Sequence, residues 1–454
     1  MKDLLIKDIV SIVEGRTQYD FAETAANCIT TDSRKIEKGD LFVALKGENF
    51  NGNDYARQAI SKGAIAVIVS EEIEAAENLP IIFTENTLEA YQSIARHHRI
   101  TMDKPIIAVT GSVGKTSTKD MIAAVLEQRF KVHKTHANHN NEIGMPQTIL
   151  GIKDEHDVAI VEMGMRGLGE IRTLSKIGMP DIGVITNIGI SHIERLKTRE
   201  NILKAKMEIA DGMDENKLLI LNANDELLIQ AGKNAHTRVE YTGIEVPCTY
   251  SAYNVESLGQ EGSYFSINHS DKTYRVKINV PGEHHISNAL VAIACGTELG
   301  MTMEAMMEGI ANYSPGDNRQ TIININNIKY IDDSYNASPD SMKAGLKVLK
   351  SIAKGRTVAV LGNMFELGDM AEEAHKEVGE MCQELGIDFS LLLGDNAKNM
   401  AEGIGDSNKY KICHNHLEIA EYLEKNLIPG DTVLIKGSRG MKMEEVLKKI
   451  TENN

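Results

Sequence analysis

One stretch decides the fold of this chain: Thr110-Gly111-Ser112-Val113-Gly114-Lys115-Thr116-Ser117-Thr118. Residues 105–109 before it form an apolar run that predicts a buried strand, and residues 119–129 after it carry apolar side chains at helical spacing. The glycines let backbone N–H groups converge on an anion at the start of the helix. The lysine then reaches the β- and γ-phosphates of a nucleotide, and the threonine hydroxyl can hold Mg2+. The stretch therefore predicts a nucleotide phosphate site.

The motif departs from the general phosphate-loop pattern at one position. That pattern has a glycine five positions before its second motif glycine, and Val109 stands there in this chain. The remaining motif is a shortened Gly-x-x-Gly-Lys-Thr. A glycine turn before an ordinary helix would also explain the two glycines, but it would not explain the adjoining Lys115 and Thr116.

The composition indicates a globular protein. The chain has 454 residues, of which 42% are hydrophobic and 25% charged, and this length suggests about three domains. The net charge of -16 argues against nucleic acid as a partner. The charged N-terminus is not a signal peptide, and no run reaches the roughly 18 apolar residues of a membrane span. Five scattered cysteines without paired spacing are typical of reduced thiols. We expect a cytoplasmic monomer without membrane insertion.

The strand and helix patterns divide the chain into three α/β units, 1–98, 99–312 and 313–454, with a linker at about 97–104. The first unit is small. The second alternates helices with strands at 158–161, 182–186 and 218–221, changes to an antiparallel excursion between about 236 and 280, and returns to helix at 284–299. The third has strands at 357–361, 389–393 and 432–435. This order predicts an α/β fold whose central domain is a parallel-sheet ATPase and whose C-terminal domain is Rossmann-like.

Polar clusters follow the strands of the second unit, where open α/β sheets bind their ligands. Glu162 ends one strand and could complete an Mg2+ shell, or it could cap a helix or form an ion pair. His192 follows the next strand, although imidazole is an unusual Mg2+ ligand and a lone histidine is more often structural. Lys206 lies within an expected helix and is, by composition, an ordinary surface lysine.

A possible anion site in the first unit contains Ser33 and Arg34. Arginine suits phosphate geometry, so this pair could contact an anionic ligand. From the residues alone, a helix cap beside a surface arginine is the better explanation.

Together these motifs resemble the Mur ligase family, the ATP-dependent amide ligases of peptidoglycan precursor synthesis. The resemblance runs from Thr31 almost to the C-terminus, and most members share the central Gly-Lys-Thr and the surroundings of Glu162 and His192. Three stretches are similar to the branch that joins D-alanyl-D-alanine to UDP-N-acetylmuramoyl-tripeptide. They are Asp332-Asp333-Ser334-Tyr335-Asn336-Ala337-Ser338-Pro339, Leu361-Gly362-Asn363-Met364-Phe365-Glu366-Leu367-Gly368 with His375, and Val433-Leu434-Ile435-Lys436-Gly437-Ser438-Arg439 followed by Met443-Glu444.

The resemblance implies catalytic roles for Lys115, Glu162, His192 and Lys206. Lys115 and Thr116 would serve the ATP phosphates and Mg2+, with Glu162 as a second metal ligand. His192 would bind a second Mg2+. Lys206 matches a lysine that CO2 converts to a carbamate in related ligases, which would make it a metal-binding anion.

The same resemblance implies ligand contacts in all three units. The ATP-binding residues would be the phosphate loop together with Asn288, which matches an adenine-contacting asparagine, and Arg319, Asp333 and Asn336 from the third unit. The residues expected to bind the UDP-muramoyl substrate are Ser33, Arg34, Asn140 and Asn141.

The implied enzyme is an ADP-forming ligase that works through an acyl phosphate in cell-wall biogenesis, and hence in cell shape and division. Several positions depart from the family pattern without removing a charged catalytic group. Asn318 stands where glycine is common, Ser338 where asparagine is usual, and Asn51-Gly52-Asn53-Asp54 replaces Asp-Gly-His. Two alternatives stay open: a sister ligase that adds a single amino acid, or glutamates to folate, and, more distantly, a phosphate-loop nucleotide switch.

Overall fold

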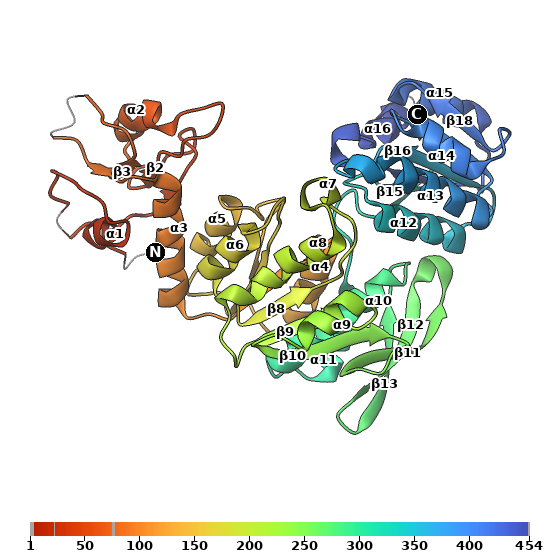
Figure 1. Cartoon of the computed structure of the whole chain (residues 1–454), viewed down its shortest axis with the longest axis horizontal. Helices are drawn as coiled ribbons and strands as arrows, with labels where there is room; N and C mark the ends of the chain where they lie inside the picture. Colours follow the sequence, from red (N-terminus) through yellow and green to blue (C-terminus); the bar gives the residue numbers. More distant parts are fainter. Residues whose placement is uncertain (1–3, 22, 75–77, 453–454) are drawn as a thin grey trace.

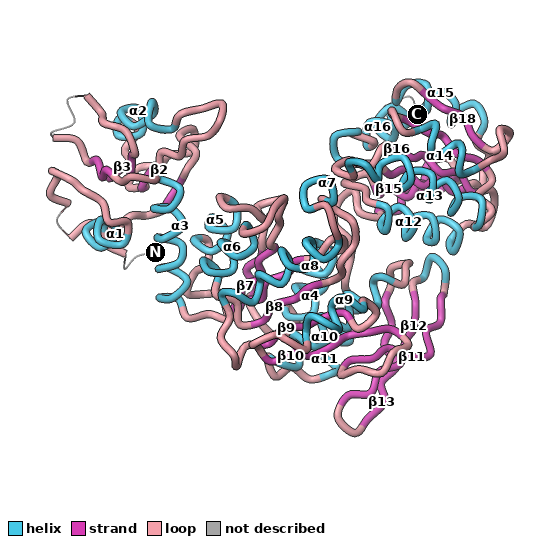
Figure 2. Tube along the Cα trace, viewed as in Figure 1, coloured by secondary structure: helices cyan, strands magenta, loops and turns pink. Residues whose placement is uncertain are grey.

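The computed structural model describes residues 4–21, 23–74 and 78–452. Figure 1 shows three lobes in chain order, with the central lobe between the first lobe at the left and the third at the upper right. Figure 2 shows that strands form the interior of the central and third lobes and that helices cover them. The expected three-part α/β fold is confirmed. Among the described residues, no helix combines the length and apolar character needed to cross a bilayer.

The first lobe contains a four-stranded parallel sheet in the order β1-β2-β3-β4. Ile6, Leu41, Ile68 and Tyr91 are buried in its core. Its elements are α1 (Ile6–Ile12), β1 (Ile29–Thr30), β2 (Leu41–Val43), η1 (Gly52–Tyr55), α2 (Ala56–Ser61), β3 (Ala66–Val69), β4 (Ile81–Phe83) and α3 (Thr87–Met102).

Helix α3 joins the first lobe to the central one. Tyr91 and Ile94 pack into the first core, whereas His98 bonds to the carbonyl of Ile152 and Arg99 to the carboxylate of Asp181, both in the central lobe. The prediction of a linker is therefore wrong for residues 97–102. These residues remain helical because His98 and Arg99 are buried and have partners in the central lobe.

The central lobe is built on a nine-stranded sheet in the order β13-β12-β11-β10-β9-β8-β5-β7-β6. The strands from β6 to β11 pair in parallel, and β11, β12 and β13 pair antiparallel, as expected for that segment. The strands are β5 (Ile106–Thr110), β6 (Val132–Lys134), β7 (Val158–Glu162), β8 (Ile182–Ile185), β9 (Leu218–Asn222), β10 (Arg238–Ile244), β11 (Tyr250–Ser257), β12 (Ser263–His269) and β13 (Lys272–Ile278).

Helices cover both faces of this sheet. Helices α4, α10 and α11 pack on one face, and α5, α6 and α8 pack on the other. The helical elements are α4 (Lys115–Leu126), α5 (Gly144–Leu150), α6 (Glu170–Gly178), α7 (Ile193–Leu196), α8 (Arg199–Met207), η2 (Glu208–Gly212), α9 (Glu226–Gly232), η3 (Gly259–Glu261), α10 (His284–Glu298) and α11 (Met303–Asn312).

The third lobe has a six-stranded sheet in the order β14-β15-β19-β16-β17-β18, parallel except for the edge strand β14. Its elements are β14 (Thr321–Ile325), β15 (Ile328–Asp333), α12 (Pro339–Ile352), β16 (Thr357–Gly362), η4 (Gly368–Met370), α13 (Ala371–Glu384), β17 (Phe389–Leu393), α14 (Ala397–Ile404), β18 (Tyr410–Cys413), α15 (His416–Asn426), β19 (Thr432–Lys436), η5 (Arg439–Met441) and α16 (Glu444–Glu452).

Candidate active site

The phosphate loop lies where the sequence predicts it, between the end of β5 and the start of α4. Gly111 and Gly114 adopt φ angles of +150° and +85°. A Cβ on Gly111 would lie 1.8 Å from the hydroxyl of Thr186, so only glycine fits there. The Lys115 ammonium donates to the carbonyl of Gly111 at 2.8 Å, which folds the lysine back over the loop.

Asn187, two residues after the end of β8, holds the loop in shape. Its carbonyl oxygen accepts from the Ser112 N–H and its side-chain oxygen from the Val113 N–H, both at 3.0 Å. No role for Asn187 was predicted from the sequence. Asn187 follows β8, which pairs in parallel with β5, and neighbouring parallel strands end at the same edge of a sheet. This order of strands was the signal that could have placed Asn187 beside the phosphate loop.

Thr116 and Glu162 form the centre of a polar cluster under the loop. The Thr116 hydroxyl donates to Glu162 Oε2 at 2.7 Å, and the Asn140 amide donates to Glu162 Oε1 at 2.8 Å. Arg319 reaches across from the connection to the third lobe and donates to the Thr116 hydroxyl at 3.0 Å. Glu162 is 3% exposed. Four residues that were expected at the site, Thr116, Asn140, Glu162 and Arg319, thus lie together in the structure.

Lys206 is buried rather than on the surface, contrary to the interpretation from composition. It is 1% exposed, and its ammonium has no hydrogen-bond or ion-pair partner among the residues that the structure describes. Burial lowers the pKa of Lys206 well below its usual range, and the charge of Lys115 lowers it further. Desolvation also lowers the pKa of Lys115; Glu162 opposes that shift and Arg319 adds to it.

His192 faces the third lobe. Its Nδ1 lies 2.5 Å from the Oε2 atom of Glu366, and this contact is the main cause that lowers the pKa of Glu366. Both residues have a positive φ, +65° for His192 and +63° for Glu366. Non-glycine residues rarely adopt this backbone conformation, so the surrounding structure must stabilise it at both residues.

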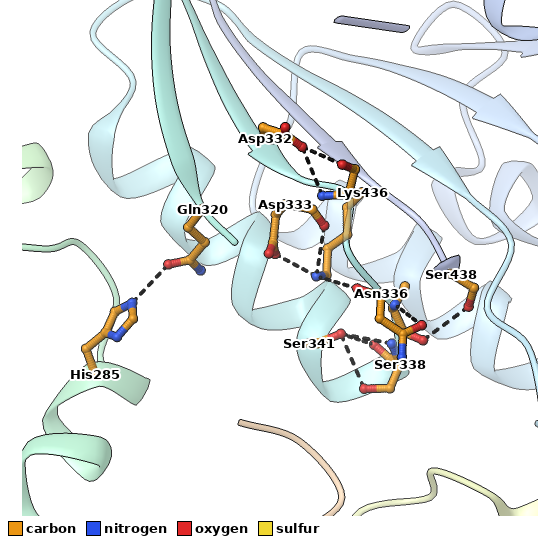
Figure 3. A network of polar contacts seen from close by, with 11 residues as sticks. His285, Gln320, Asp332, Asp333, Asn336, Ser338, Ser341, Lys436 and Ser438 are labelled. Atoms are coloured by element: carbon orange, nitrogen blue, oxygen red, sulfur yellow. Dashed lines mark hydrogen bonds and ion pairs between the residues drawn. The ribbon is translucent and has the colours of Figure 1, made fainter. Parts of the chain in front are cut away.

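In the third lobe, Asp333 and Asn336 lie beside Lys436 at the carboxyl ends of β15 and β19 (Figure 3). The Lys436 ammonium is 2.6 Å from the Asp333 carboxylate and donates to the Asn336 carbonyl at 3.1 Å. Lys436 is 2% exposed. The sequence included Lys436 in a motif but gave it no role, because a lone lysine after a strand carries no signal of its burial.

One cleft of about 1270 Å3 collects most of these groups, and residues of all three lobes line it, but Lys206 is not part of its lining. The carboxyl ends of β7 and β9 face it from the central sheet and those of β15 and β19 from the third sheet. Its lining includes Gln92, Lys115, His192, Asn288, Arg319 and Lys436.

Known proteins share this whole architecture. Models of the Mur ligase family catalytic domain, the Mur ligase middle domain and the Mur ligase glutamate ligase domain match residues 26–137, 109–296 and 318–439. The UDP-N-acetylmuramoyl-tripeptide--D-alanyl-D-alanine ligase of Bacillus subtilis strain 168 is 37% identical over 99% of this chain and 98% of its own. The chain belongs to the Mur ligase family.

Solved structures of Mur ligases match this chain over nearly its full length. MurF from Acinetobacter baumannii has a TM-score of 0.91 and 29% identity, covering 99% of this chain and 98% of its own. MurF from Thermotoga maritima, in complex with ADP, has a TM-score of 0.85 and 26% identity, covering 94% and 97%. The protein is accordingly a ligase, and its resemblance to the family is confirmed.

The expected substrate residues of this Mur ligase lie in different places. Asn140 and Asn141 line the cleft, and the Asn141 side chain also accepts from the Gly144 N–H at the start of α5. Ser33 and Arg34 are outside the cleft lining, in a turn of the first lobe. There the exposed Arg34 guanidinium pairs with Asp32 at 2.8 Å and lowers the pKa of Asp32 to about 2.

Proposed function

We propose that this ligase joins D-alanyl-D-alanine to UDP-N-acetylmuramoyl-tripeptide in the cytoplasm and converts ATP to ADP and phosphate. The product is the UDP-muramoyl-pentapeptide precursor of peptidoglycan. The name of the full-length relative supports these substrates, and ADP in the Thermotoga maritima MurF supports the nucleotide. The observation that carries the proposal is the cleft in which the phosphate loop meets Arg319 and Lys436. The units 1–98, 99–312 and 313–454 would share the binding of the substrates and the catalysis.

The reaction proceeds in two steps. A carboxylate oxygen of the tripeptide bonds to the γ-phosphorus of ATP as the bond to ADP breaks, which gives an acyl phosphate. The dipeptide amine then attacks the acyl carbon, phosphate leaves, and the nitrogen loses a proton as the amide forms. Lys115 and Arg319 neutralise the charge that develops on the transferred phosphoryl group, because positioning and electrostatics supply most of the rate in such transfers.

The donor atoms around the loop fit Mg2+. The Thr116 and Glu162 oxygens lie 2.7 Å apart on the cleft, and Mg2+ takes one or two protein oxygens together with water and phosphate oxygens. The described residues contain no cluster of three or more His, Cys, Asp or Glu side chains able to hold a metal ion. Thr116 and Glu162 would hold the ion together with the ATP phosphates, and His192 would serve a second ion. The metal supplies charge neutralisation at the phosphates.

Lys206 supplies a further anion in this proposal. Burial lowers the pKa of Lys206, which favours the neutral amine. A neutral amine nitrogen can bond to CO2 with loss of one proton. The resulting carbamate has two oxygens for a metal. Ser33 and Arg34 would contact the uridine diphosphate from the first lobe, and third-lobe residues would close onto the phosphate loop when ligands bind.

The test is the mass of the product formed from ATP, D-alanyl-D-alanine and each of two tripeptides, one with lysine and one with diaminopimelate at the third position. We expect a pentapeptide product from at least one of them, with phosphate released only when tripeptide and dipeptide are both present. Full turnover without the dipeptide, or a product carrying one added amino acid, would contradict the proposal.

A further inference from the structure

A loop of the third lobe, residues 363–367, carries a carboxylate that reaches the central lobe. Glu366 Oε2 lies 2.5 Å from Nδ1 of His192, and the Glu366 carbonyl accepts from the Glu194 N–H at 3.3 Å. The φ angle of Glu366, +63°, is rare for a residue with a side chain, and such a conformation persists only where the surrounding structure fixes it. The contacts of the residues before Glu366 therefore determine whether its carboxylate reaches His192.

The two residues before Glu366 donate their N–H groups to buried side chains. The Met364 N–H donates to Nε2 of His375 at 2.9 Å, and the Phe365 N–H donates to the Ser438 hydroxyl, also at 2.9 Å. His375 lies on α13 and is 0% exposed, whereas Ser438 follows β19 (Figure 3) and is 3% exposed. Two separate elements of the third lobe thus fix the backbone directly before Glu366.

Both ring nitrogens of His375 have backbone partners. Because the Met364 N–H is a donor, Nε2 of His375 is the acceptor, and the ring hydrogen lies on Nδ1. Nδ1 then donates to the Ala371 carbonyl at 2.6 Å, on the same helix. Desolvation lowers the pKa of His375, and the bond to Ala371 opposes this shift. Burial thus favours the neutral ring that can accept from Met364, and the ring links the loop to α13.

We propose, resting on the ligation proposed above, that His375 is a positioning residue that acts on His192 through Glu366. His375 fixes the Met364 N–H, this bond places Glu366, and the Glu366 carboxylate orients the ring of His192 from the other side of the cleft. A carboxylate beside one nitrogen of a histidine fixes the orientation of the ring and leaves the other nitrogen for a ligand. In His192 that other nitrogen is Nε2.

The first experiment follows the ring nitrogens of His192 by NMR in the ligand-free full chain, labelled with ring-15N histidine. The His192→Gln variant identifies the signals. We expect His375→Leu and Glu366→Ala to shift these signals in the same direction, because each removes the carboxylate from Nδ1. His375→Gln should keep the wild-type position, since its amide oxygen still accepts from the Met364 N–H. Unchanged His192 signals in His375→Leu overturn the proposal.

Val378→Ala, the matched control, separates positioning from a loss of stability. Val378 is buried on α13, the helix of His375, and a valine side chain cannot hydrogen-bond. The cavity left by the shorter side chain should lower the urea midpoint while the His192 signals keep their position. The same shift in Val378→Ala as in His375→Leu overturns the proposal. Where His375→Leu does not fold, Ser438→Ala removes the acceptor of the Phe365 N–H instead, and unchanged His192 signals there overturn the proposal.

The second experiment measures kcat of the ligation at a temperature where every variant is folded. We expect His375→Leu to lower kcat roughly 10-fold or more, the usual effect of losing a group that orients a ligand-binding histidine. In a Glu366→Ala background the same substitution should lower kcat by about twofold or less, because the carboxylate that His375 places is already absent. His375→Gln should keep kcat within about threefold of the wild type. Equal factors for His375→Leu in the two backgrounds refute the assignment.

The two experiments keep this proposal apart from the proposed function, because the NMR measurement needs no substrate. Shifted His192 signals in His375→Leu, with no pentapeptide product from the wild-type chain, count against the proposed function and support the role of His375. Pentapeptide formation by the wild type, with unchanged His192 signals in His375→Leu, supports the proposed function and counts against His375.

Discussion

Lys206 lies in an environment that makes a lysine reactive. Its side chain is buried and has no carboxylate partner among the described residues. Besides burial, the charge of Lys115 lowers the pKa of Lys206. We predict that Lys206→Ala lowers kcat by about 100-fold or more, the usual effect of losing one electrostatic group in an active site. Bicarbonate with a short carboxylic acid should restore part of the rate, because both supply the missing carboxylate. The measurement is the rate of phosphate release.

The control for this prediction lies two residues away. Lys204 is on the same helix but exposed, so Lys204→Ala should keep near-normal activity. Near-normal activity of Lys206→Ala would rule out the carbamate role, and a loss that no small acid restores would leave the lysine as a packing residue.

Glu208 connects two elements of the site. Its buried carboxylate accepts from the Gly169 N–H through both oxygens at 2.9 Å and from the Arg172 N–H at 3.1 Å, at the start of α6. Glu208 also begins the turn that ends α8, the helix of Lys206. We predict that Glu208→Ala destabilises the central lobe by about 1–3 kcal/mol, because buried donors lose their acceptor. Urea unfolding of the variant measures this cost.

The matched control is Glu215→Ala, which removes an exposed carboxylate close by in the sequence and should change stability by less than about 0.5 kcal/mol. Equal urea midpoints for Glu208→Ala and Glu215→Ala would contradict the role of Glu208 as a cap of α6. A fall of kcat in Glu208→Ala at temperatures where it remains folded would show that the cap also positions Lys206.

We expect the junction of the first two lobes at helix α3 to be sensitive to pH because of His98. Burial lowers the pKa of His98, and the bond to the Ile152 carbonyl opposes the shift only in part. As pH falls below about 6.5, the unfolded chain takes up a proton that the folded chain does not, so stability falls with pH. We predict that His98→Gln, which keeps a donor to Ile152, loses less stability than the wild type between pH 7.5 and 5.5. Thermal unfolding at the two pH values tests this, and parallel losses would refute it.

Sequence patterns predicted what depends on local spacing. The phosphate loop and the strands around it lie as expected because glycine turns, apolar runs and helical spacing act within a few residues. The burial of Lys206 and the contact of His192 with Glu366 could not be predicted in this way. Both depend on which distant element covers a helix or strand end, and lysine, the residue type least expected in a core, gives no hint of it. The same reason explains the missed helix at residues 97–102, whose partners lie in the central lobe.

The whole molecule carries a net charge of -16, and charges of both signs line its cleft. The six cations of the lining, Lys115, Arg166, Arg195, Arg319, Lys436 and Arg439, lie among seven carboxylates. Anionic ligands therefore depend on cations placed at particular points of the cleft, which favours ligands that fit it over polyanions that need a broad positive surface.

Glu366 links the third lobe to the central lobe across this cleft. Its carboxylate contacts His192, Arg166 and Arg195 lower its pKa further, and its carbonyl accepts from the Glu194 N–H at 3.3 Å. We predict that Glu366→Ala loosens the third lobe in the ligand-free protein, so that small-angle scattering gives a larger radius of gyration. Substrates should restore the compact form, because bound ligands then bridge the lobes. Glu377→Ala, which breaks a half-buried ion pair with Lys343 inside the third lobe, should scatter like the wild type. Equal curves for all three ligand-free proteins would show that the contact does not hold the lobes together.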